Sequence, residues 1–451
     1  MNCRRSRNFR TYLLYLSVSL LVILQATPAA SRLYIDIDSP MQKKLKIAIP
    51  RFRTEGGTAA DQLIGRELVE ILSNALDFSG LFQILNPAVF LQDPEQMGVE
   101  LQEIKFSEWR FLNVDLLVRG SYKIQGDLMV LTVRLYDVIQ QKRLLRKTYG
   151  DRLANARQTI LDFADEIMLE LTGQPGIFQT KIAFVGDTSG HKEIYLADFD
   201  GSNIVQLTHN RNISLSPAWS SDGKKISYVG YQKNSPDLYI VDLITRAVQR
   251  LRMGSLNIAP AWHPKEAKLA ATLSRETSRT LTDLYLLDVR GQIVRQLTNS
   301  WSIDVSPSWS PDGKKLAYVS NRAGKPQIYV LDLDTGRSTR LTFEGDYNTS
   351  PAWSPRGDRI VYAGLHNGQF DIYTIRPDGR ELLQLTGGAG NNEDPCWSAD
   401  GRLILFQSDR QGSNNLWLML ANGAEQRQLR LNLRGFQTEP SWSPRLTWTP
   451  P

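Results

Sequence analysis

The feature that most constrains the fold is a tryptophan motif that recurs six times in the second half of the chain. Each tryptophan stands two residues after a proline, and successive copies lie 43, 47, 44, 44 and 45 residues apart, at Trp219, Trp262, Trp309, Trp353, Trp397 and Trp442. An apolar stretch such as 328–332 (IYVLD) and a short stretch such as 340–342 (RLT) recur in step. Four short strands in a unit of about 45 residues are typical of a β-propeller blade.

The two ends of the repeat region complement each other. The first repeat begins at its second strand, at 181–186, and the last repeat ends after its first strand, at 440–445. Together they make one complete blade. We therefore predict a six-bladed β-propeller over residues 181–445, closed by strands from both ends, because a lone blade cannot cover its own faces.

Residues 32–172 are predicted to form a separate α/β domain. Alternating and helical apolar patterns indicate strands at 45–52, 82–85 and 143–149, a hairpin at 115–138, and helices at 60–78 and 154–172. A Gly-Gln-Pro-Gly stretch at 173–176 ends the second helix and opens a linker over 173–180. The expected fold class is thus an α/β N-terminal domain followed by an all-β six-bladed β-propeller, with a short tail at 446–451.

Residues 1–31 have the composition of a cleaved secretory signal peptide. Four arginines and no acidic residue are followed by an apolar run at 11–24 and then by small residues. That run is shorter than the ~20 residues that span a membrane, so we expect export without direct membrane insertion. Loss of the four arginines lowers the net charge from +6 to 6 − 4 = +2, and we therefore expect no nucleic-acid partner.

Motifs for catalysis are scarce. The chain has no Gly-x-Ser-x-Gly nucleophile elbow, no phosphate-binding glycine loop and no Cys-x-x-Cys pair. Glu393, Asp394 and Glu439 lie in adjacent loops, where carboxylates could hold a hard cation such as calcium. An alternative is that they serve a secreted propeller hydrolase, a glycosidase or a peptidase. We otherwise expect no cofactor and no enzymatic activity.

The loops that lead from the fourth strand of one blade to the first strand of the next overhang the central channel. Three residues before each proline stand Ser214, Asn257, Asp304, Asn348, Asn392 and Gln437. One residue before each proline stand Ser216, Ala259, Ser306, Ser350, Asp394 and Glu439. Short polar side chains can cap turns locally. They can also form a polar socket for a peptide or a protein loop, and both interpretations stay open.

Aromatic residues stand in the same loops, at Trp301, Phe343, Tyr347 and Phe436. They either form a binding hot spot or pack beneath their neighbours. At the other end of the chain, Leu33, Ile35 and Ile37 alternate with polar residues and predict an amphipathic strand. Such a strand can sit at the edge of its own sheet or pair with the sheet of a partner.

The combination of signal peptide, α/β domain and six repeats ending in PSWSPRL resembles the TolB family, periplasmic propeller proteins of the Tol-Pal envelope system. The resemblance implies a periplasmic, monomeric, non-enzymatic protein. It implies that the outer-membrane lipoprotein Pal binds over the propeller mouth and that the N-terminal strand contacts the inner-membrane protein TolA. It also implies roles in outer-membrane integrity and in constriction during cell division. The implied Pal surface comprises Asn257, Ala259, Asp304, Val305 and Ser306, with the equivalent loops around Asn348, Asn392 and Gln437.

Overall fold

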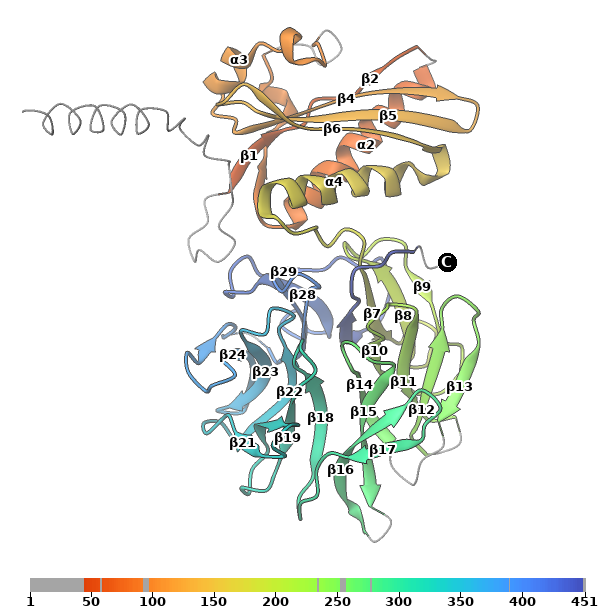
Figure 1. Cartoon of the computed structure of the whole chain (residues 1–451), viewed down its shortest axis with the longest axis vertical. Helices are drawn as coiled ribbons and strands as arrows, with labels where there is room; N and C mark the ends of the chain where they lie inside the picture. Colours follow the sequence, from red (N-terminus) through yellow and green to blue (C-terminus); the bar gives the residue numbers. More distant parts are fainter. Residues whose placement is uncertain are drawn as a thin grey trace, which may run out of the picture.

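The computed structural model describes residues 44–448, apart from 57–58, 92–96, 233–234, 252–256, 276–277 and 389. The predicted signal peptide, the predicted strand with Leu33, Ile35 and Ile37, and residues 449–451 lie outside the described residues. Figure 1 shows an α/β domain seated on one end of a β-propeller. No helix in the described part of the chain is long and apolar enough to cross a membrane.

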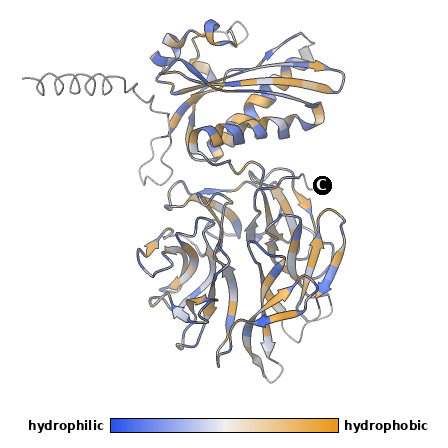
Figure 2. Ribbon diagram, viewed as in Figure 1, coloured by the Kyte–Doolittle hydropathy of each residue, from blue (hydrophilic) through white to orange (hydrophobic). Residues whose placement is uncertain are grey.

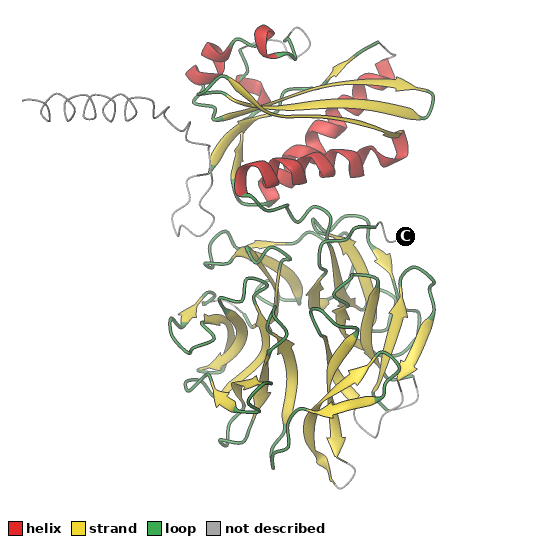
Figure 3. Cartoon of the chain, viewed as in Figure 1, coloured by secondary structure: helices red, strands yellow, loops and turns green. Residues whose placement is uncertain are grey.

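The α/β domain is one mixed sheet with two long helices on one face. The strands run in the order β3-β1-β4-β5-β6, and β2 pairs with β4. Their bounds are β1 Leu45–Ala48, β2 Arg53–Thr54, β3 Phe82–Ile84, β4 Leu116–Gln125, β5 Leu128–Asp137 and β6 Lys142–Arg152. The helices α2 (Ala59–Phe78) and α4 (Ala156–Thr172) lie between this sheet and the propeller, as Figure 3 shows.

The local sequence signals explain where these elements end. The predicted hairpin is confirmed, and it turns at Gly126, whose φ of 64° favours glycine. Helix α4 ends at Gly173, which has a φ of 74° and donates its amide hydrogen to the carbonyl of Leu169. The predicted end of the second helix is therefore confirmed.

A second layer on the opposite face of the sheet was not predicted. The short helix α3 (Phe106–Phe111) and the segment before it cover that face, with Phe106 and Trp109 buried against Tyr136. Fully buried Arg119 on β4 donates to the carbonyls of Gly98 (Nε, 3.1 Å) and Met97 (Nη2, 2.9 Å). This layer has little regular structure, so it leaves no periodic pattern in the sequence.

Six four-stranded antiparallel sheets make up the propeller. The innermost strands are β10 Ser214–Trp219, β14 Asn257–Trp262, β18 Asp304–Trp309, β22 Tyr347–Trp353, β26 Asn392–Trp397 and β30 Gln437–Trp442. The second strands are β7 Lys181–Gly186, β11 Lys225–Gly230, β15 Lys268–Arg275, β19 Lys315–Ser320, β23 Ile360–His366 and β27 Leu403–Ser408.

The third strands of the blades are β8 Glu193–Asp198, β12 Asp237–Asp242, β16 Ser278–Asp288, β20 Gln327–Asp332, β24 Gln369–Ile375 and β28 Asn415–Leu420. The outermost are β9 Val205–Gln206, β13 Val248–Leu251, β17 Ile293–Gln296, β21 Ser338–Arg340, β25 Leu383–Gln384 and β29 Arg427–Gln428. Figure 2 shows apolar residues alternating with hydrophilic ones along many of these strands. The predicted fold class is confirmed.

The ring closes as the sequence predicts. Strand β30 joins β7, β8 and β9 in one sheet, with Trp442 opposite Ile182. The amide of Lys181 donates to Ser443 Oγ at 2.8 Å, and Trp442 Nε1 donates to Thr180 Oγ1 at 2.8 Å. Both ends of the propeller are thus held in a single blade.

The recurring tryptophans lie buried between neighbouring blades. Trp219 Nε1 donates to the carbonyl of Ser441 at 3.2 Å, and Trp309 Nε1 donates to the carbonyl of Ala261 at 3.1 Å. In each of these two pairs the acceptor belongs to the preceding blade. The indole therefore fills the gap between two sheets and also joins them by a hydrogen bond.

The α/β domain contacts the end of the propeller where the innermost strands terminate. Arg445 Nη2 lies 2.7 Å from Asp165 Oδ2 on α4, and Arg427 Nη2 donates to the carbonyl of Phe78 at 2.8 Å. The apolar core is continuous across this contact and includes Phe178 and Leu418. The opposite end of the propeller faces away from the α/β domain (Figure 1).

We predict that Trp442→Ala lowers the free energy of unfolding by about 3–5 kcal/mol, because it leaves a cavity in the blade that closes the ring. Urea titration measures this change. Trp301→Ala is the matched control, since Trp301 is 90% exposed, and it should change stability by no more than about 0.5 kcal/mol. Equal stability of the two variants would contradict the role assigned to the closing blade.

Candidate functional site

The candidate site is the mouth, by which we mean the end of the propeller opposite the α/β domain. The loops that lead into the innermost strands form it, at 207–213, 297–303, 341–346, 385–391 and 429–436. The corresponding loop into β14 includes residues 252–256, which lie outside the described residues. The hairpins between second and third strands surround these loops.

Each innermost strand carries one bulge at the residue before its proline. These residues have φ values between 47° and 53°, and the register with the second strand shifts beside each of them. The bulge residues are Ser216, Ala259, Ser306, Ser350, Asp394 and Glu439. All six line the central channel, a cavity of about 470 Å³. The ring of small and polar side chains expected at this position therefore lies on the channel wall.

Two of these channel residues, Asp394 and Glu439, carry carboxyl groups that are largely buried in the channel wall. Ser350 Oγ donates to Asp394 Oδ1 at 2.7 Å, and the amide of Ser216 donates to Glu439 Oε2 at 2.6 Å. Burial raises the pKa of Glu439 to about 7, and the nearby charge of Asp394 adds to this effect. Burial also raises the pKa of Asp394. Ionisation of either carboxyl group in the channel therefore costs free energy.

The three carboxylates considered as a cation site, Glu393, Asp394 and Glu439, are not gathered around one point. Among the residues that the structure describes, no three His, Cys, Asp or Glu side chains are arranged to hold a metal ion. Glu393 lies near Asp394, and burial followed by the charge of Asp394 raises the pKa of its carboxyl. Glu393, Asp394 and Glu439 thus do not converge on one point, although the neighbouring innermost strands β26 and β30 carry them.

The polar residues three positions before each proline lie beneath the mouth surface. Ser214, Asp304, Asn348, Asn392 and Gln437 are all buried, whereas the side chain of Asn257 is not described. Asn348 Nδ2 donates to Gln327 Oε1 at 2.9 Å, and Asn392 Nδ2 donates to Asp371 Oδ1 at 3.1 Å. Gln327 and Asp371 stand on the third strands β20 and β24 of the preceding blades, so these two side chains fasten the start of one blade to the blade before it.

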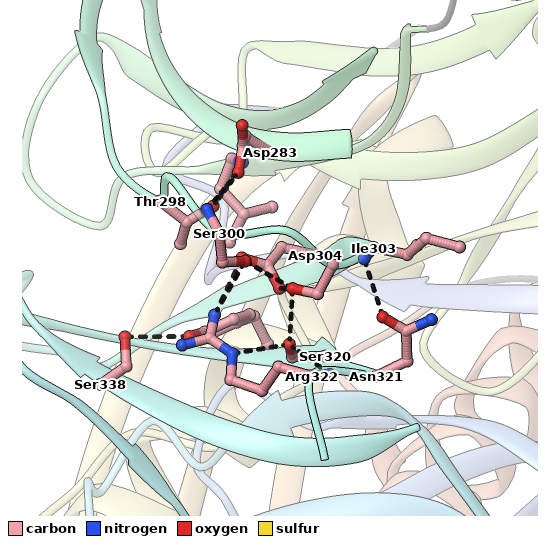
Figure 4. Close-up of polar contacts among 12 residues, drawn as sticks. Asp283, Thr298, Ser300, Ile303, Asp304, Ser320, Asn321, Arg322 and Ser338 are labelled. Carbon is pink, nitrogen blue, oxygen red and sulfur yellow. Dashed lines mark hydrogen bonds and ion pairs between the residues drawn. The ribbon is translucent and has the colours of Figure 1, made fainter. Parts of the chain in front are cut away.

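The most extensive of these networks surrounds Asp304 (Figure 4). Its carboxylate is fully buried and accepts hydrogen bonds from Ser300 Oγ and Ser302 Oγ, each at 2.9 Å. Arg322 Nη2 lies 2.9 Å from Asp304 Oδ2 and supplies the compensating charge. This network fixes the loop 297–303, and the loop carries Trp301 at its tip.

Exposed apolar side chains stand above these buried networks. Trp301 is 90% exposed, Phe343 is 71% exposed, and Ile303 and Tyr347 are each 40% exposed. We call these four residues the apolar rim. They come from two neighbouring loops, 297–303 and 341–346, together with the first residue of β22. Large exposed apolar residues gathered in one place mark a surface that binds another molecule.

Phe436 differs from the other predicted aromatic residues. It is half-buried, and Lys192 Nζ lies 5.5 Å from the centre of its ring. Phe343 is stacked beneath Arg340, 4.7 Å from the guanidinium carbon, and still remains exposed. Ile303 was not predicted from the sequence, although it stands two residues after Trp301 in the same loop.

We predict that Asp304→Ala lowers the free energy of unfolding by about 3–5 kcal/mol, because it leaves the partly buried charge of Arg322 without its carboxylate partner. Asp346→Ala is the control, since Asp346 pairs with Lys325 and both side chains are exposed; stability should not change measurably. Thermal unfolding of both variants checks this. A stable Asp304→Ala protein would contradict the structural role of the network.

Comparisons with known proteins agree with this architecture. Residues 168–446 match the model of the TolB beta propeller domain, and residues 33–144 match that of the TolB amino-terminal domain. The Tol-Pal system protein TolB of Desulfosudis oleivorans is 42% identical over 286 residues, which are 63% of this chain and 65% of that relative. The chain thus spans just under two thirds of this relative.

A second relative and a solved structure match a larger part of the chain. A protein TolB homolog of Chlorobium luteolum is 38% identical over 305 residues, 68% of either chain. The crystal structure of TolB from Acinetobacter baumannii superposes with a TM-score of 0.78 at 26% identity and covers 89% of this chain and 97% of that one. Both domains and their order are shared with that structure. The chain therefore belongs to the TolB family.

Proposed function

We propose that this protein is a non-enzymatic, protein-binding component of the Tol-Pal system in the periplasm. The observation that carries the proposal is the apolar rim, exposed at the mouth of a propeller whose relatives are named for that system. A Pal-like outer-membrane lipoprotein would dock over the mouth. No cofactor is part of this proposal, and the protein would act as a monomer that supports outer-membrane integrity and constriction during cell division.

The geometry favours the mouth over other faces of the propeller. The opposite end contacts the α/β domain through Arg445 and Arg427 and is therefore partly covered. Trp301 and Ile303 of the apolar rim stand on a loop that the Asp304 network holds in place, so a partner would not have to order this loop. Aromatic side chains presented in this way commonly dominate binding energy.

The channel below the rim extends the proposed contact surface. Ala259, Ser306 and Ser350 line its wall, and Val305 is half-buried beside them. A partner loop that crosses the apolar rim could place its tip among these small side chains. The buried residues Asp304, Asn348, Asn392 and Gln437 would contribute indirectly, by holding the loops that carry the contact residues.

A second partner would bind at the other end of the chain. We propose that the strand with Leu33, Ile35 and Ile37 pairs with a sheet of a TolA-like inner-membrane protein. That strand precedes β1, the strand beside the centre of the α/β sheet. Because the α/β domain and the propeller share one core, the two binding regions would be mechanically connected.

A hydrolase remains the alternative, and one observation speaks for it. The pKa of Glu439 is raised to about 7, which suits a general acid. Burial accounts for that pKa, however, and Glu439 already accepts hydrogen bonds from the amide and the hydroxyl of Ser216. We therefore favour binding over catalysis.

The test is capture of the periplasmic domain of a Pal-like lipoprotein from the same genome, measured by calorimetry. We expect the double substitution Trp301→Ala and Phe343→Ala to weaken binding by about 100-fold or more, because two exposed aromatic anchors are lost. Phe111→Ala is the matched control, since Phe111 is 77% exposed at the end of α3 in the α/β domain. Unchanged affinity of the double variant, with an intact fold, would refute the mouth as the binding face.

A further inference from the structure

We propose that the mouth has two chemically distinct halves and selects a partner segment that is acidic as well as apolar. The first half is the apolar rim. The second half is the basic rim, which we define as Lys192, Arg211 and Arg434. This inference rests on the proposed function, because it specifies the chemistry of the partner that the mouth would bind.

The two rims lie across the channel from each other. Innermost strands contact one another around the ring in the order β10, β14, β18, β22, β26 and β30, and β30 returns to β10. The apolar rim stands on the loops that enter β18 and β22. Arg211 stands on the loop that enters β10, and Arg434 on the loop that enters β30, three places further around the ring in each case. A segment laid across the mouth would therefore touch both rims.

The charges of the basic rim are exposed and not neutralised within the described part of the chain. Lys192, Arg211 and Arg434 are exposed, and none of them forms an ion pair with a described residue. His191 and His209 are exposed beside them. The basic side chains near the apolar rim behave differently, because Arg322 pairs with Asp304 and Lys325 pairs with Asp346. Among the described residues of the mouth, the exposed basic side chains without an ion pair thus lie in the basic half, whereas Arg340, which stacks on Phe343 without an ion pair, is half-buried.

The acidic groups close to the basic rim are already engaged. Asp187 Oδ1 accepts a hydrogen bond from the amide of Phe436 at 2.9 Å. Glu193 is buried. Its Oε1 accepts a hydrogen bond from the backbone amide of Arg211 at 2.8 Å, and its Oε2 accepts one from Ser214 Oγ at 3.3 Å. These carboxylates shape the loops and leave the three cationic side chains to face solvent.

The backbone of the basic rim is fixed in advance. Arg211 has a φ of 53°, and the hydrogen bond that its backbone amide donates to Glu193 Oε1 holds it there. Lys192 rests over the ring of Phe436, and the carbonyl of Arg434 accepts a hydrogen bond from Thr188 Oγ1 at 2.5 Å. Charges at fixed positions on a rim raise the association rate and the specificity for a partner of opposite charge.

The channel beneath the rims disfavours negative charge on the partner, unlike the basic rim. Asp394 and Glu439 are the charged residues among those that line it. An acidic side chain of the partner would be repelled there, so its acidic residues belong at the basic rim. The part of the segment that enters the channel should be uncharged or basic.

The first test measures binding of the same Pal-like periplasmic domain at about 50 mM and about 200 mM salt. We expect Lys192→Glu with Arg211→Glu to weaken binding by about 10-fold at low salt, mainly through the association rate, and to abolish the salt dependence. The matched control reverses two exposed arginines in hairpins at the other end of the propeller, Arg290→Glu with Arg337→Glu, and should bind like the parent.

The outcomes separate the two proposals. If Trp301→Ala with Phe343→Ala abolishes binding while the charge reversal changes neither affinity nor salt dependence, the basic rim is wrong and the proposed function stands. If the parent chain does not bind the lipoprotein domain at all, the proposed function fails, and a second probe still decides the inference.

That second probe is a pair of synthetic peptides with one tryptophan-containing sequence, flanked by glutamates in one and by lysines in the other. The parent chain should bind the glutamate peptide at least about 5-fold more tightly, and the charge reversal at Lys192 and Arg211 should remove this preference. Equal binding of both peptides, or tighter binding of the lysine peptide, would overturn the inference.

Discussion

The pairing of β30 with β7 is the constraint on which the rest of the structure depends. It joins residues about 260 positions apart into one blade and so fixes the number of blades and the diameter of the ring. Once the ring is closed, six copies of the same bulge face one channel, and the described loops into the innermost strands face one mouth. A single repeat carries no binding surface; the surface exists because the ring places neighbouring loops side by side.

The mouth combines buried polar groups with exposed apolar groups, which reverses the usual arrangement. Asp304 and Asn348 lie under the surface and hold their loops by hydrogen bonds, whereas Trp301 and Phe343 remain exposed above them. A loop fixed in this way loses little conformational entropy when a partner binds. The buried hydrogen bonds therefore fix the shape of the loops before binding, and the exposed residues are left to contact the partner.

Much of the fold could be predicted from the sequence, because its signals are local and periodic. The spacing of Trp219 to Trp442 gives the blades, and the incomplete repeats at both ends give the closure. The site could be predicted only in outline. Polarity before the prolines suits a socket and a cap equally, and only burial shows that Asp304 acts as a cap. Glu393 does not join Asp394 and Glu439 on the channel wall, because adjacent residues of a strand point in different directions.

Hydrogen exchange of the full chain, with and without the Pal-like domain, tests the central claim most directly, because it reports every loop at once. Binding at the mouth predicts slower exchange in the hairpin 187–192 and in the loops 207–213, 297–303, 341–346 and 429–436, which carry the two rims apart from Tyr347. Exchange in α2 and α4 should stay the same. Protection confined to these helices, or to the hairpins that face the α/β domain, would contradict the assignment of the mouth as the binding surface.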